Sequence, residues 1–180
     1  NRKETLQFLD SFTAVWYYEG NVRRSLLRYK FYNARSFAPG YGRLLAIKLQ
    51  QENPGGFDCI TWVPVSSLRK LTRGYDQVEL LAKAVGRELG MEPVPLLKKI
   101  RHNRPQSGIS DAAARRANVL GVYQAVKPER PLSAYRLVIL GTPVWAGRCS
   151  SVMRSFLKKY GLSICDINAV FITHEHVDHV

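Results

Sequence analysis

Long apolar runs and paired cysteines are missing from this sequence. No apolar run approaches the roughly 20 residues that cross a bilayer, and the N-terminal stretch NRKETLQFLD lacks the apolar region of a signal peptide. The cysteines, Cys59, Cys149 and Cys165, lie far apart and form no C-x-x-C pair, which is typical of buried thiols in a reducing compartment. These absences favour a cytoplasmic protein without a membrane span.

Acidic residues are also scarce. The 14 Asp and Glu residues face 27 Lys and Arg residues, which gives a formal net charge of +13 at pH 7. Such an excess attracts phosphate groups and repels basic partners, so we expect a phosphate-rich small molecule or nucleic acid as the ligand. A basic surface without a specific ligand is the alternative. The sequence does not indicate an oligomeric state.

Apolar periodicity predicts strands that alternate with helices, and therefore an α/β fold with a mostly parallel sheet flanked by helices. The expected strands are 14–18, Cys59–Val63, 118–126, Leu137–Leu140 and a last strand before His174. The expected helices are 22–31, 42–50, 77–89, a short helix before Asn118, and 152–160. The 180 residues are enough for one domain.

Two groups of basic residues are candidate sites. The first lies in an expected loop before the helix that Asp76 should cap, where helix N–H groups would add to side-chain charge in binding an anion. Its members are Arg69, Lys70, Arg73, Gly74 and Gln77. The second surrounds a polar loop and is a candidate for nucleic acid or other phosphates. Its members are Arg101, Arg104, Arg115 and Arg116.

Residues 17–126 resemble the competence protein F (ComF) family of phosphoribosyltransferase-like proteins. The motifs are YYEGNVRRSLLRYKF, VPVSSLRKLTRGYDQVELLAKAVGRELG and RPQSGISDAAARRANVLGVY, in that order. The resemblance implies a type I phosphoribosyltransferase-like domain over 1–180 and a role in DNA uptake. The RGYDQ segment would face the pyrophosphate of phosphoribosyl pyrophosphate, which is bound with Mg²⁺. Asp76 departs from the family, which usually has Asn at this position, and the family's N-terminal cysteine-rich ribbon is absent.

The expected phosphoribosyl pyrophosphate loop is replaced by a segment of different character. At 136–161 the family resemblance calls for two acidic residues and a Thr-rich turn, but Gly141 and Thr142 stand in the acidic positions. Without carboxylates the segment has little to hold ribose hydroxyls or hydrated Mg²⁺. Instead, residues 135–162 resemble the central strand, loop and helix of flavodoxin-like proteins. That resemblance implies flavin mononucleotide beside a loop that contains Trp145, Gly147 and Arg148, although Trp145 could equally be a packed core aromatic.

The C-terminal tail carries a third motif. His174, His176, Asp178 and His179 match the H-x-H-x-D-H pattern, and imidazoles with a carboxylate suit Zn²⁺. Residues 174–179 therefore resemble the metallo-β-lactamase fold, which implies a metal-dependent hydrolase. The remaining ligands of that family would come from later in a chain, so only a fragment of such a site is expected here.

Together these motifs predict a composite chain, truncated at both ends, whose residues 135–180 are foreign to the preceding domain. The leading hypothesis is a ComF-like domain that binds phosphate-rich ligands, including single-stranded DNA, without an intact transferase site. The alternatives are a phosphoribosyltransferase with residual activity, a flavin mononucleotide-binding electron carrier and a fragment of a metal-dependent hydrolase. If the chain is an enzyme, phosphoribosyl transfer is the expected reaction. The path of residues 141–151 would decide whether that loop binds phosphate or flavin.

Overall fold

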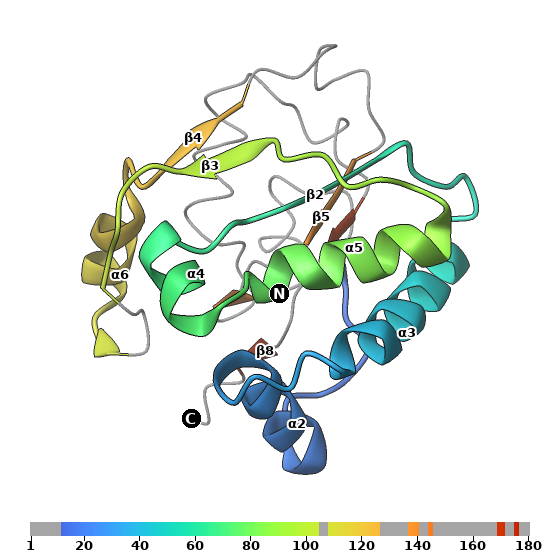
Figure 1. Cartoon of the computed structure of the whole chain (residues 1–180), viewed down its shortest axis with the longest axis horizontal. Helices are drawn as coiled ribbons and strands as arrows, with labels where there is room; N and C mark the ends of the chain where they lie inside the picture. The colour runs from blue at the N-terminus through green and yellow to red at the C-terminus, as the bar shows by residue number, and fades with distance from the viewer. Residues whose placement is uncertain are drawn as a thin grey trace.

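Helices and short strands follow one another along the chain in Figure 1. The computed structural model describes residues 12–104, 108–126, 137–140, 144–145, 169–171 and 175–176. The helices in these residues are α2 (Gly20–Phe31), α3 (Phe37–Glu52), α4 (Ser67–Arg73), α5 (Gln77–Leu89) and α6 (Ala112–Val119). The strands are β1 (Phe12–Thr13), β2 (Cys59–Trp62), β3 (Leu97–Lys99), β4 (Tyr123–Ala125), β5 (Leu137–Leu140), β6 (Val144–Trp145), β7 (Ala169–Phe171) and β8 (Glu175–His176).

The strands form three small sheets. One has the order β1-β7-β5-β2, and its neighbours pair in parallel, with Ile60 of β2 opposite Val138 of β5. The strands β3 and β4 form an antiparallel pair, in which Leu97 faces Ala125. The strands β6 and β8 pair in parallel.

The expected fold, a mostly parallel sheet flanked by helices of the type I phosphoribosyltransferase kind, is wrong. The described structure is helix-rich, with a small two-stranded antiparallel sheet. The strands that do pair in parallel are short, and β2 and β5 have only 4 residues each. The main core is built by the packing of α3 against α5 and β2, and not by helices that cover both faces of a sheet.

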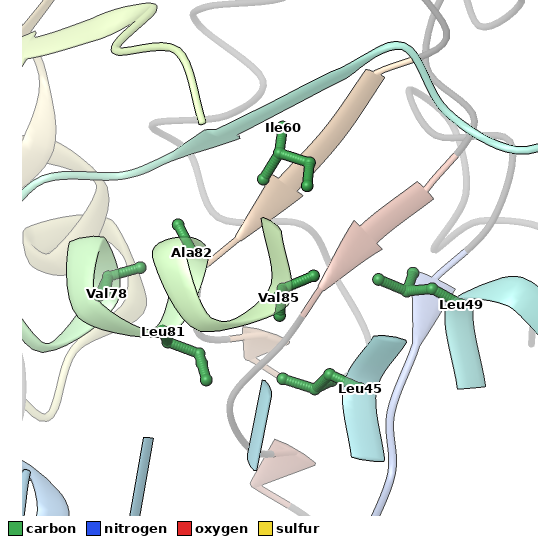
Figure 2. Close-up of a cluster of buried hydrophobic side chains, with 7 residues drawn as sticks. All are labelled: Leu45, Leu49, Ile60, Val78, Leu81, Ala82 and Val85. Atoms are coloured by element: carbon green, nitrogen blue, oxygen red, sulfur yellow. The ribbon is translucent and has the colours of Figure 1, made fainter. Parts of the chain in front are cut away.

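The main core lies between α3, α5 and β2. Figure 2 shows Leu45 and Leu49 of α3 on one side of α5 and Ile60 of β2 on another. All three side chains are at most 1% exposed. From α5 the core takes Val78, Leu81, Ala82 and Val85. Because these residues recur at helical spacing in the sequence, one face of α5 is apolar. The observed helix confirms the helix predicted at 77–89.

The two helices α3 and α5 approach closely because α3 presents a glycine at their contact. A Cβ added at Gly42 would lie 2.5 Å from the Cβ of Ala84 and 2.8 Å from its carbonyl carbon. Both residues are buried. Only hydrogen fits at Gly42 unless one helix moves away from the other.

A second, more polar core joins α2 to the same helices. Tyr29 of α2 is 3% exposed and packs with Ala38, Tyr75 and Ala84. Its hydroxyl donates to the carbonyl of Gln77 at 2.6 Å, and the Tyr75 hydroxyl donates to the carbonyl of Tyr29. These bonds fix the C-terminal half of α2 against the start of α5.

Other local predictions had mixed outcomes. The strand predicted at Cys59–Val63 is confirmed as β2, and the helix predicted at 42–50 is confirmed within the longer α3. The strand predicted at 14–18 is wrong, because these residues form bends and Trp16 packs edge-on against Tyr41 at 5.4 Å. The helix predicted at 152–160 lies outside the described residues.

None of the helices in the described ranges combines the length and the apolar character needed to cross a bilayer. Cys59, the cysteine within these ranges, is buried and is not part of a disulfide.

The close contact at Gly42 predicts opposite effects for two glycine substitutions in the same helix. Gly42→Ala should lower the free energy of unfolding by about 1–3 kcal/mol, because the new methyl group overpacks the contact with Ala84. Gly40→Ala is the matched control, since an added Cβ there meets nothing within 4 Å. It should raise the free energy of unfolding by up to about 1 kcal/mol through helix propensity. Urea denaturation measures both, and equal effects would contradict the close helix contact.

Candidate anion-binding site

The segment between β2 and α5 is a helix followed by a tight turn. Ser66 caps α4 and accepts from the Arg69 N–H at 3.3 Å, and Gly74 ends the helix with a left-handed φ of 76°. The sequence-based expectation of a basic loop at Arg69–Gly74 is therefore wrong in its backbone. The consequence is that Arg69 and Arg73, four residues apart, project from neighbouring turns of one helix.

The N-terminus of α5 is already occupied by a carboxylate of the chain itself. Asp76 is 4% exposed. Its Oδ1 accepts from the N–H groups of Val78 at 2.9 Å and Glu79 at 3.2 Å, and its Oδ2 accepts from Val65 at 2.9 Å. A ligand phosphate cannot use the same N–H groups, so this helix terminus does not contribute the anion site that the sequence suggested. Any anion must be bound by side chains.

Cationic side chains from four separate segments gather around this capped turn. We call Lys30, Arg35, Arg69, Arg73 and Lys99 the basic cluster. They come from the end of α2, the turn after α2, α4 and β3. Arg69, Arg73, Lys30 and Lys99 are half-buried.

Arg73 lies at the centre of the basic cluster. Its guanidinium donates to Gln77 Oε1 at 2.9 Å and lies 5.1 Å from the centre of the Phe31 ring. This contact brings the C-terminal end of α2 to the C-terminal end of α4. Gln77, one of the predicted site residues, therefore positions Arg73.

Arg69 extends the basic cluster toward β3. Its guanidinium donates to the carbonyl of Asn103 at 2.9 Å, while Lys99 Nζ donates to Asn103 Oδ1 at 2.6 Å. Lys99 Nζ also lies 5.2 Å from the centre of the Tyr123 ring. One asparagine thus holds the two cations beside each other.

Gly74 makes room for Arg35. A Cβ at Gly74 would lie 2.8 Å from Nη2 of Arg35, and the Arg35 guanidinium lies 4.5 Å from the centre of the Tyr75 ring. Asn33, which has a positive φ of 56°, accepts from Arg35 Nε at 2.7 Å through its Oδ1. The predicted site residue Gly74 therefore lies against the end of the Arg35 side chain and ends α4 with a positive φ.

Burial and the charge of a neighbouring arginine lower the pKa of three members of the basic cluster, Lys30, Arg73 and Lys99. Burial, and then the charge of Arg73, lowers the pKa of Lys30 from 10.5 to about 8. Burial, and then the charge of Arg69, lowers the pKa of Lys99 from 10.5 to about 8. Burial and the charge of Arg69 also lower the pKa of Arg73. Asp76 acts in the opposite direction on Lys99 and Arg73, but its single charge does not cancel these effects.

Lys70 belongs to a different part of the surface. Its Nζ lies 2.8 Å from Glu79 Oε2, and Lys83 Nζ lies 2.9 Å from Glu79 Oε1. The hydrogen bond from Lys70 lowers the pKa of Glu79, and so does the one from Lys83. Because Glu79 offsets its charge, Lys70 contributes less to an anion site than its sequence neighbours.

The second predicted group of arginines does not form one cluster of open guanidinium groups in the described residues. Arg101 donates to the carbonyl of Leu120 at 2.6 Å, just after α6, and Arg115 donates to the carbonyl of Ile109. Arg104 is exposed at the end of a described range, and the side chain of Arg116 lies outside the described residues. Arg101 and Arg115 thus hold the loops on either side of α6.

The remaining predicted sites fall largely outside the described residues. Gly141, Thr142, Gly147, Arg148, His174, Asp178 and His179 lie outside them. The backbones of Trp145 and His176 are described and face each other in the pairing of β6 with β8. In the ranges that the structure describes, no group of His, Cys, Asp or Glu residues could hold a metal ion. The flavin and Zn²⁺ hypotheses stay predictions.

Sequence reasoning missed Lys30, Arg35 and Lys99 as members of this site. Each is far along the chain from the residue of the site that it approaches: Lys30 from Arg73, Arg35 from Gly74 and Lys99 from Arg69. The sequence signal for Lys99 was weak. Alternate residues of a strand lie on the same side, so Lys99 shares the side of β3 that buries Leu97 and is itself half-buried. For Arg35 we find no sequence signal.

Comparisons of the chain with protein-family models, with curated proteins and with solved structures find no match. The three family resemblances therefore stay hypotheses drawn from short motifs.

The lowered pKa of Lys30 predicts a defined pH dependence of stability. Between pH 8 and 10.5, Lys30 is protonated in the unfolded chain and deprotonated in the folded chain. The contribution of Lys30 to the free energy of unfolding therefore rises with pH across this range. Below pH 8 the full cost of the buried ammonium is present. Lys30→Met removes this titration. The difference in free energy of unfolding, wild type minus variant, should therefore increase from pH 8 to 10.5.

Urea denaturation at several pH values measures this difference. Lys98→Met, which removes a lysine from an exposed position on β3, is the matched control for loss of one positive charge. A wild-type minus Lys30→Met difference that stays flat across the window would contradict the buried, repelled ammonium.

Proposed function

We propose that the chain binds phosphate-rich ligands at the basic cluster, and that single-stranded nucleic acid is the macromolecular ligand. The observation that carries the proposal is the imbalance of charge at this place. Lys30, Arg69, Arg73 and Lys99 are half-buried beside one another, and the nearby carboxylate of Asp76 is committed to backbone N–H groups. Phosphate groups would relieve this repulsion and accept hydrogen bonds from the guanidinium groups.

Nucleic acid suits the charge of the whole chain as well as the charge of the cluster. The net charge of +13 attracts a polyanion over a distance and favours release of its counterions on binding. The hypothetical resemblance to a competence family points in the same direction. A phosphoribosyl transfer reaction is not part of the proposal, because Gly141 and Thr142 stand where carboxylates would be needed.

Substitution of the central arginine tests the proposal. Arg73→Gln should weaken the binding of a single-stranded oligodeoxythymidylate by about tenfold, because a charge-assisted hydrogen bond to phosphate is lost. The slope of the logarithm of the binding constant against the logarithm of salt concentration should fall by about 0.7, since one phosphate contact disappears. Fluorescence anisotropy titrations across a salt series measure both quantities.

Arg87→Gln is the matched control, since Arg87 is an exposed arginine in the last turn of α5. Arg87→Gln should leave the affinity for the oligonucleotide and the salt slope close to those of the wild type. Inorganic pyrophosphate should compete with the oligonucleotide in the wild type and in Arg87→Gln, since both keep Arg73. An affinity that does not depend on salt, or an equal loss in both variants, would refute the proposal.

A further inference from the structure

Two adjacent aromatic rings are exposed where α2 ends. Phe31 is 60% exposed and Tyr32 is 76% exposed. Single exposed apolar residues are common on protein surfaces and need no ligand. Here, however, the two rings belong to consecutive residues, and Phe31 contacts Arg73 of the basic cluster. We call Phe31 and Tyr32 the aromatic pair.

The sequence of α2 explains why these rings face solvent. Leu26 and Tyr29 form its buried side, where Tyr29 is held by Gln77 and Tyr75. Arg24, Arg28 and Phe31 recur at helical spacing on another side, and all three are exposed. The exposed side of α2 is therefore basic along its length and aromatic at its C-terminal end.

The contact between Arg73 and Phe31 joins the aromatic pair to the basic cluster. The Arg73 guanidinium lies 5.1 Å from the centre of the Phe31 ring, within the range of a cation–π interaction. This contact positions the Phe31 ring and leaves it 60% exposed. A ligand that reaches Arg73 with a phosphate therefore reaches the aromatic pair with the group attached to that phosphate.

Charge limits what can cover the aromatic pair. The 12 residues of α2 include Arg23, Arg24, Arg28 and Lys30 and no acidic residue. A basic or neutral apolar partner would leave these charges unpaired at the edge of the contact, whereas a polyanion complements them. An acidic peptide supplies charge but no regular array of flat apolar faces. Single-stranded nucleic acid supplies both, because its bases are unpaired and its phosphates follow at regular intervals.

We propose that Phe31 and Tyr32 stack with unpaired bases of a single-stranded nucleic acid whose phosphates lie on Arg73 and the rest of the basic cluster. The inference rests on the proposed function and adds a base-binding site to the phosphate site. It accounts for two exposed rings in a strongly basic setting. It also gives selectivity for single strands, since a duplex keeps its base faces inside the helix.

The experiment compares three probes on the full chain, each about 12 nucleotides long. They are an oligodeoxythymidylate, an abasic oligonucleotide with the same phosphates, and a duplex. The wild type should bind the oligodeoxythymidylate about 5-fold or more tighter than the abasic strand, the factor expected when one base stacks on an aromatic ring. The duplex should also bind more weakly than the oligodeoxythymidylate.

Substitution of each ring should remove this preference. Tyr32→Leu and Phe31→Leu should each reduce the affinity for oligodeoxythymidylate by about 5-fold or more. Tyr32→Leu should leave the affinity for the abasic strand and the salt slope at their wild-type values, because it removes no contact of Arg73 and no phosphate contact. Tyr17→Leu is the matched control: Tyr17 is 79% exposed but precedes the other end of α2, about 18 Å away along the helix. It should change neither affinity.

The outcomes separate the two proposals. Equal wild-type affinity for the abasic strand and the oligodeoxythymidylate would overturn the stacking inference and leave phosphate binding intact. Equal losses of affinity for oligodeoxythymidylate in Tyr32→Leu and Tyr17→Leu would also overturn the stacking inference. Displacement of the oligonucleotide by polyglutamate at an equal concentration of charge would do the same. No binding of any probe would refute the proposed function and the inference with it. Circular dichroism melting curves of each variant check that it keeps the wild-type fold.

Discussion

The buried carboxylate of Asp76 is the interaction on which the rest of the described structure depends. It binds the first N–H groups of α5 and also the N–H of Val65, so it connects the end of β2 to the helix that supplies most of the core. The two oxygens have backbone partners, and the residue is 4% exposed. The helix α4 lies in the segment between these two connections.

The same carboxylate explains the character of the candidate site. Asp76 is near enough to Arg73 and Lys99 to affect their pKa values, but its position is set by the backbone and not by the cations. Surplus positive charge therefore stays at the surface of this turn, where it raises the electrostatic energy of the free protein. A bound phosphate would lower that energy. Under the proposed function, this relief of charge repulsion would favour anion binding.

The local parts of the fold could be predicted from the sequence, whereas the assembly could not. Asp76 and Gly90 mark the two ends of α5, and the apolar runs of β2 and β5 predict strands. These features could be predicted because helix ends and short strands depend on residues that are neighbours in the sequence. The helix α4 was missed although Ser66 and Gly74 mark its ends, since a short basic segment has no apolar side to reveal its period. The expected mostly parallel sheet flanked by helices was wrong because the described structure is helix-rich. The predicted strand at 14–18 forms bends, and only Tyr123–Ala125 of the predicted strand at 118–126 is a strand, which pairs antiparallel with β3.

Arg69 and Arg73 could be predicted because they lie in one basic segment just before α5, but Lys30 and Lys99 required the tertiary structure that brings α2 and β3 to α4. The central claim is that these separate segments meet to bind phosphate. Backbone hydrogen exchange with and without a saturating oligodeoxythymidylate tests it most directly. The account predicts slower exchange in residues 30–35, 66–77 and 97–103 when ligand is bound. Protection confined to other residues, such as 108–119, would contradict it.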